Sequence, residues 1–181
     1  MKDSKQKQRT KKDIATALIA LLDTQSFDSI TVNDICDRGL IHRSTFYRHF
    51  QDKYSLLAYA IQLIYKEIST HTLNKGLNDR AFIEELVNYV DKHRKLFINV
   101  TINNRKGDIY DELVKLISEV ILTNAENMDD PISVSINGSS NPKLLSSFYS
   151  GGIIEVLKQW INNPQQISKQ ELISLLDELI G

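Results

Sequence analysis

The spacing of the apolar residues is the feature that most constrains how this chain can fold. These residues recur at intervals of three and four, which places each group on one face of an α-helix. The pattern begins with Ile14, Leu18 and Leu22 and continues to the leucines of the last ten residues. It predicts an all-α protein of about nine helices.

Capping residues and helix breakers indicate where the helices end. Thr10 or Lys11 is expected to begin the first helix, after a flexible basic tail, and Thr31 to cap the second. Gly39 is expected to end that second helix in the left-handed conformation. The other helices are expected near residues 43–49, 52–75, 82–89, 93–103, 107–127, 145–160 and 168–179.

Residues 128–142 interrupt the helical pattern. Part of this segment alternates apolar and polar side chains, as a strand would, but a single strand has no partner in this sequence. The segment is also rich in Asp, Asn, Gly, Ser and Pro. We therefore predict a polar loop there.

Composition excludes several classes of protein. The chain has 181 residues, of which 41% are hydrophobic and 25% charged, as in soluble globular domains. No apolar run reaches the roughly 18 residues of a membrane span, and the basic start lacks the apolar stretch of a secretory signal. Cys36 and four scattered His residues do not have the spacing of a zinc site. We expect a cytoplasmic protein without cofactor, metal or membrane contact.

Charge is distributed unevenly along the chain. The net charge is −1, yet residues 1–55 carry ten Lys and Arg against seven Asp and Glu, whereas residues 56–181 carry twelve against sixteen. The first twelve residues alone have a net charge of +5. A basic start joined to an acidic remainder is suited to a protein that meets phosphates with one end only.

Residues 31–53 form the motif with the clearest chemical meaning. Two short helices meet at a glycine, and the second offers Arg, His and hydroxyl side chains while Phe46 and Phe50 face inward. A helix of this kind fits the major groove of DNA, where Arg pairs with guanine and the methyl group of Thr packs on that of thymine. A plain helical hairpin with a solvated polar face has the same pattern.

Residues 10–68 closely resemble the N-terminal domain of the TetR/AcrR family of bacterial transcriptional regulators. The resemblance rests on FDSITVNDI at residues 27–35 and on STFYRHFQDK at residues 44–53. It implies a helix-turn-helix DNA-binding domain over residues 8–68 and an effector-binding and dimerisation domain over residues 69–181. The pattern FYxGGIxxxLxxWI from residue 148 also resembles a subgroup that includes an activator of dihydroxyacetone kinase genes.

The resemblance implies which side chains meet DNA. Thr31 and Lys53 are expected to contact phosphates, and Arg43 and Thr45 to lie nearest the bases. The family often has Gly or Pro at the position of Ser44, so Ser44 adds a hydroxyl here. Arg43 predicts a guanine in each half-site. The full expected set is Thr31, His42, Arg43, Ser44, Thr45, Tyr47, Arg48, His49 and Lys53.

The resemblance also implies a homodimer on a palindromic double-stranded operator. The last two helices are expected to pack against their copies, with Phe148, Gly152, Ile153, Val156, Trp160, Leu172, Leu176 and Leu179 in the interface. The pair Gly151-Gly152 would allow close approach of two backbones, or would simply leave the helix slack or kinked. A small apolar or amphipathic effector is expected to meet Tyr65, Tyr89, His93, Phe97, Tyr110 and Tyr149, although each of these is also compatible with the core or the surface.

The sequence thus predicts a regulator, most simply a homodimeric repressor that an effector releases from its operator. The alternative is a regulator of the same fold that acts through a protein partner without an effector. Because the sequence contains no paired carboxylates, nucleophile elbow, phosphate-binding glycine loop or metal cluster, we do not expect an enzyme.

Overall fold

The computed structural model describes residues 2–74, 79–101, 108–126, 131–163 and 165–180. Over these residues the chain forms ten α-helices and one 3₁₀ turn without any strand, which confirms the all-α class with one helix more than expected. The elements are α1 (Lys2–Leu22), η1 (Phe27–Ser29), α2 (Val32–Gly39), α3 (Arg43–His49), α4 (Lys53–Asn74), α5 (Asp79–Lys92), α6 (Arg94–Thr101), α7 (Asp108–Ala125), α8 (Pro131–Gly138), α9 (Pro142–Asn162) and α10 (Lys169–Ile180).

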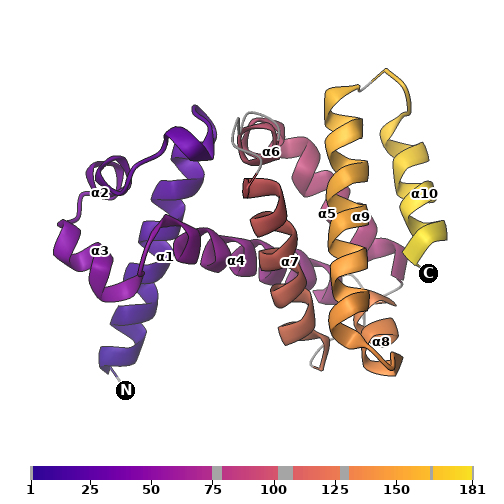
Figure 1. The fold of residues 1–181 in the computed structure, drawn as a ribbon, viewed down its shortest axis with the longest axis horizontal. Helices are drawn as coiled ribbons and strands as arrows, with labels where there is room; N and C mark the ends of the chain where they lie inside the picture. Colours follow the sequence, from indigo (N-terminus) through magenta and orange to yellow (C-terminus); the bar gives the residue numbers. More distant parts are fainter. Residues whose placement is uncertain (1, 75–78, 102–107, 127–130, 164, 181) are drawn as a thin grey trace.

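A small head and a larger body make up the molecule. Figure 1 shows α1, α2 and α3 at one end, α9 and α10 toward the other, and α4 running from the head into the body. The expected division at residue 68 falls inside α4, which continues to Asn74. That domain boundary therefore stays a prediction.

The head is built around the apolar faces of α1 and α3. Ile14, Leu18 and Leu22 of α1 are buried, as the helical spacing predicts, and they share a core cluster with Phe27 and Phe46. Both of these aromatic side chains are fully buried. The head thus has its own aromatic centre, which holds α2 and α3 against α1.

The turn between α2 and α3 uses Leu40 rather than Gly39 as its left-handed residue. Gly39 is the last residue of α2, and Leu40 has φ 52° and ψ 43°. A Cβ placed on Gly39 would lie 3.5 Å from the Cβ of Ala17 on α1. The prediction was wrong by one position because the glycine lies where α2 approaches α1, and the exposed Leu40 takes the strained conformation.

The basic N-terminal segment is helical, which corrects the expected flexible tail. The first helix begins at Lys2 rather than Thr10, so that the Lys and Arg residues lie on one continuous rod. Lys5, Lys7, Arg9 and Lys12 are exposed along it. This rod reaches past α3 at the N-terminal end of the molecule (Figure 1).

The segment expected to be a polar loop contains α8. Ile132 and Ile136, one helical turn apart, are buried, and Ser133 between them is also buried. Val134, which an alternating strand would place beside them, is 59% exposed. The prediction was wrong because Ile132 and Ile136, four residues apart, fit both periods, and packing on α7 and α9 selects the helical one.

Two apolar clusters lie along the molecule. The first joins the head to α6, α7 and Ile154 of α9, and the second joins α5, α7, α8, α9 and α10. Because α7 and α9 belong to both clusters, the core is continuous from the head to the body. Among the described residues, no helix has both the length and the hydropathy needed to cross a bilayer.

Candidate nucleic-acid interface

Helix α3 is held by one fully buried aromatic residue. The ring centroid of Phe46 lies 5.3 Å from that of Tyr47 and 6.0 Å from that of Phe50. This anchor turns the rest of the short helix outward: His42, Arg43, Ser44, Tyr47 and Arg48 are exposed, and Thr45 and His49 are half-buried. Seven of the expected DNA-contact residues therefore lie together on or beside one helix.

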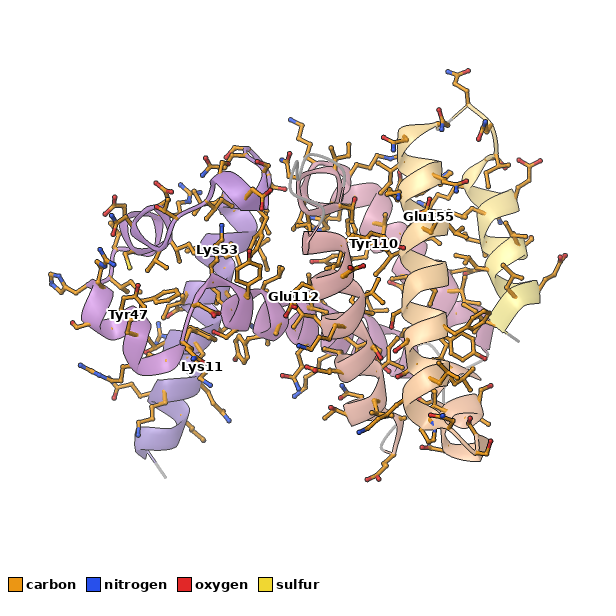
Figure 2. The ribbon with its side chains drawn as sticks, in the orientation of Figure 1. Lys11, Tyr47, Lys53, Tyr110, Glu112 and Glu155 are labelled. Atoms are coloured by element: carbon orange, nitrogen blue, oxygen red, sulfur yellow. The ribbon has the colours of Figure 1, made fainter. Side chains whose placement is uncertain are left out.

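Arg43 and Tyr47 support one another on the exposed face of α3. A guanidinium nitrogen of Arg43 donates to the hydroxyl of Tyr47 at 3.3 Å, and the guanidinium carbon lies 5.7 Å from the centre of the tyrosine ring. The two residues are one helical turn apart on α3, and Tyr47 is labelled in Figure 2. This contact limits the rotamers of Arg43 before it meets any ligand.

Thr31 is engaged with Asp34 in a complete capping box. The Thr31 hydroxyl donates to Oδ2 of Asp34 at 2.6 Å and accepts from the backbone N–H of Asp34 at 3.2 Å. The backbone N–H of Thr31 donates to the same carboxylate oxygen at 2.7 Å. The side-chain hydrogen bond from Thr31, followed by the backbone one, lowers the pKa of Asp34. A phosphate contact by the Thr31 hydroxyl would therefore compete with this cap.

Lys53 is occupied by backbone carbonyls, which argues against its expected phosphate contact. Its Nζ donates to the carbonyl oxygens of Phe27 at 2.9 Å, Asp28 at 3.1 Å and Ile30 at 2.9 Å. It also lies 4.7 Å from the ring centre of Phe27. An ammonium group has three protons to donate, and three carbonyls of the η1 turn receive them. Lys53, labelled in Figure 2, thus fastens α4 to the turn before α2.

Lys11 and His49 meet where α1 passes the end of α3. The Lys11 ammonium lies 5.5 Å from the ring centres of both Phe50 and Tyr59. Burial, and then the positive charges of Lys11, Arg48 and Lys7, lower the pKa of His49. The lowered pKa favours the neutral imidazole of His49 at pH 7, which can form hydrogen bonds without carrying a charge.

An apolar cavity of about 150 Å³ lies at the junction of the two core clusters. Of the six residues expected to meet an effector, Tyr65 and Phe97 line it. Tyr89, His93, Tyr110 and Tyr149 are not among its lining residues, and their contact with an effector stays a prediction. Tyr89 stacks on His93 with 4.5 Å between ring centroids, and burial raises the pKa of Tyr89 to about 12. Tyr110 reaches toward the carbonyl of Gly151 instead.

The remaining lining is almost entirely aliphatic and comes from α1 and from α4 to α9. We expected aromatic residues with polar ends to form the effector pocket. Because that criterion leaves out Ile and Leu, the sequence analysis did not select the aliphatic residues that line the cavity. The i, i+3, i+7 spacing of Leu57, Ala60 and Ile64 on α4 was visible, but an apolar stripe that borders a cavity has the same sequence as one that fills a core.

The residues expected at a dimer interface fall into three groups. Phe148, Gly152 and Leu179 are exposed, and Ile153 and Val156 are half-buried. Trp160, Leu172 and Leu176 are at most 4% exposed and lie inside the second core cluster of the single chain, so their place in a dimer interface stays a prediction. Leu144, which is 68% exposed, and Leu175, which is 40% exposed, are further exposed apolar residues of α9 and α10 outside the expected interface set.

No group of three or more His, Cys, Asp or Glu side chains suited to a metal ion occurs among the described residues. The chemistry available on the exposed face of α3 is hydrogen bonding by cationic and neutral polar groups. This face is suited to base edges and phosphates.

Comparison with solved structures finds the same helical fold over nearly the whole chain. A TetR transcriptional regulator from Streptococcus agalactiae 2603V has a TM-score of 0.61 and 18% identity, with 99% of this chain and 98% of that chain covered. The dihydroxyacetone kinase operon activator DhaS has a TM-score of 0.51 and 21% identity, covering 94% and 93%. The fatty acid degradation regulator FadR from Bacillus halodurans has a TM-score of 0.53 and 13% identity, with 94% of both chains covered. At these identities the likeness shows the fold alone.

Comparison with family models is more specific. None of the curated proteins matches the sequence. Residues 14–60, which contain α2 and α3, match the family described as bacterial regulatory proteins, tetR family. Residues 78–181, more than half of the chain, match the TetR_C_8 model, described as a transcriptional regulator C-terminal region. With a helix-turn-helix head on an all-helical body, this chain belongs to the TetR family of DNA-binding, non-enzymatic transcriptional regulators.

Proposed function

We propose that this protein is a cytoplasmic homodimeric repressor, which binds a palindromic operator through α3 and leaves it when a small molecule enters the apolar cavity. The observation that carries the DNA-binding part is the exposed face of α3, where cationic and hydroxyl side chains surround a helix held by the buried Phe46. Family membership supports the regulatory role.

Arg43 and Arg48 have different roles in this proposal. Arg43 lies in the first turn of α3 and is oriented by Tyr47, so it reads a base, with guanine as the partner that its two-pronged geometry favours. Arg48 lies in the last turn and contacts a phosphate. His42, Ser44, Thr45, Tyr47 and His49 complete the contact surface, while Thr31 contributes through the helix that it caps.

The cavity gives the proposal its means of release. Its wall includes Ile19 and Leu22 of α1 as well as Leu157 and Ile161 of α9. A molecule that fills it therefore contacts the head and the dimerising body at once. Release requires only that the molecule bind better to the conformation whose two heads do not fit the operator.

Dimerisation through α9 and α10 is supported by two exposed apolar stripes. Leu144, Phe148 and Gly152 are one turn apart on α9, and Leu175 and Leu179 are one turn apart on α10. A Cβ on Gly152 would meet nothing within 4 Å, so the backbone there is open to close approach. Exposed apolar groups in such an arrangement are typical of a protein interface.

Binding to operator variants tests base reading by Arg43. A DNA sequence is first selected from a random pool, and affinity is measured by fluorescence anisotropy at several salt concentrations. Arg43→Ala should cost about 1–3 kcal/mol on the selected sequence and less on variants at one base pair. Arg48→Ala should weaken all sequences equally and reduce the salt slope by about 1.

Lys95→Ala on α6 is the matched control, since it removes an exposed positive charge from the body. Equal losses for Arg43→Ala on every sequence would overturn base reading. Failure to select any specific sequence would favour a regulator that acts through a protein partner.

A further inference from the structure

We infer that the cavity takes an uncharged hydrocarbon-like molecule of about the size of a benzene ring, and that it rejects an amphipathic anion of the same size. This inference rests on the proposed function only for its regulatory consequence. The selectivity itself follows from the volume of the cavity, the chemistry of its lining and its place in the core.

The volume sets the size of the occupant. The cavity holds about 150 Å³, and an engineered cavity of about this volume with Leu, Ile and Phe walls stays dry and binds benzene or xenon in another protein. The side chains that border it, such as Ile64, Ile117 and Leu157, are aliphatic. A single ring or a short alkane fits.

The few polar residues of the lining already have partners. The Thr101 hydroxyl donates to the carbonyl of Phe97 at 2.6 Å. The Lys158 ammonium is paired with Glu155, and it lies 5.1 Å from the centre of the Tyr110 ring. Tyr65 packs its ring edge against Phe82, with 6.0 Å between centroids. The lining thus rewards apolar surface rather than hydrogen bonds.

Among the described lining residues, Lys158 is the only cation. Its pairing with Glu155 disfavours the binding of an anionic ligand. The hydrogen bond from Lys158, followed by that from Gln159, lowers the pKa of Glu155, so the carboxylate stays charged at neutral pH. An anionic ligand would have to share Lys158 with Glu155, whose negative charge one turn away on α9 (labelled in Figure 2) opposes it, and it would lose its own hydration on entry. An uncharged ligand has neither cost.

The position of the cavity gives this selectivity a consequence. Leu57 and Ala60 in its wall belong to the first core cluster, and Leu157 and Ile161 to the second. The occupant completes apolar packing between the clusters, and apolar burial is the only substantial gain that it brings. The effector is therefore recognised by shape and apolar surface.

Thermal unfolding and calorimetric titration with benzene and with benzoate test the inference. Both probes share a ring, but only benzoate is charged. Benzene at a hundred times its dissociation constant should raise the melting temperature by several degrees, and benzoate at the same concentration should not. Leu86→Trp on α5 places a ring against the cavity and should weaken benzene binding at least tenfold. Leu122→Trp, half-buried on α7 outside the lining, should not.

A second measurement does not depend on these variants folding. Nuclear Overhauser effects from benzene to the methyl groups of Ala60 and Leu157 in the unmodified protein should place the ring in the cavity. Benzoate binding as tightly as benzene, or no benzene binding at all, would overturn the inference. Operator affinity is measured separately. If benzene binds in the cavity and the selected operator stays bound, the selectivity stands and release by the occupant fails.

Discussion

Lys53 lies where the sequence motif predicts a basic side chain, but in the free protein its partners are backbone carbonyls. The sequence motif predicts a basic side chain beside the recognition helix, and it is there, but its three protons go to carbonyls of Phe27, Asp28 and Ile30. The η1 turn brings these carbonyls together around the ammonium group, and the sequence analysis did not predict that turn. Lys53→Met should therefore lower the free energy of unfolding by about 2–4 kcal/mol, measured by urea denaturation.

The exposed Lys12 provides the control, since Lys12→Met removes the same charge from α1 and should leave stability within about 0.5 kcal/mol. A Lys53→Met protein as stable as the unmodified one, with a salt slope of DNA binding reduced by about 1, would restore the phosphate contact instead.

Leu40 has a left-handed backbone conformation that is unfavourable for a residue with a Cβ atom. It is the only non-glycine residue with positive φ among the described residues, and its side chain is 93% exposed. The left-handed conformation costs an L-residue roughly 1–2 kcal/mol, part of which the greater freedom of an unfolded glycine offsets. Leu40→Gly should raise the free energy of unfolding by about 1 kcal/mol in chemical denaturation. Leu40→Ala keeps the Cβ, so an equal gain there would refute this explanation.

At the scale of elements, the first turn of α2 depends on pH through its capping box. The hydrogen bonds from Thr31 lower the pKa of Asp34 in the folded protein, so the carboxylate stabilises the head above its ordinary pKa near 4. This contribution is lost as the pH falls through the lowered value. The destabilisation caused by Asp34→Ala should therefore be full at pH 7 and shrink below pH 4, measured by urea unfolding across that range.

Asp37→Ala changes an exposed carboxylate of the same helix outside the box. Its effect on unfolding should be small at every pH. A loss for Asp34→Ala that is the same at pH 7 and at pH 2.5 would contradict the role of the ionised cap.

The elements also show what sequence reasoning can reach. Helices α2 and α10 begin at capping residues whose side chains bond the backbone of the first turn, and local signals suffice for them. Helix α8 was missed because Ile132 and Ile136 fit both a helix and a strand, and only contacts with α7 and α9 decide between them. The start of α1 was misplaced for a similar reason: exposed Lys and Gln residues extend a helix without any apolar stripe.

At the scale of the whole molecule, packing determines what the sequence could not separate. An apolar stripe can face a core, a cavity or the outside of the molecule, and all three occur here. Trp160 and Leu176 face the core, Phe97 faces the cavity, and Phe148 and Leu179 face outward. The sequence analysis therefore found the helices of the candidate dimer surface but assigned several buried residues to it, and it predicted aromatic cavity residues where aliphatic ones are present.

The outward stripes lead to a prediction about assembly. If α9 and α10 pair with their copies, a carboxylate in place of Phe148 or Leu179 would have to be buried beside apolar groups, at a cost that separates the subunits. Because these side chains are 70% and 60% exposed in the single chain, Phe148→Glu and Leu179→Glu should fold normally. Light scattering after size exclusion should then give the mass of one 20.7 kDa chain rather than two. Leu40→Glu makes the same change in the head and should leave the dimer intact.

Two half-sites one helical turn or more apart need two linked heads. The separated subunits should therefore keep weak binding to a single half-site while losing most of their affinity for the palindrome. A monomer that binds the full operator as tightly as before would refute the proposal that the protein binds its operator as a dimer.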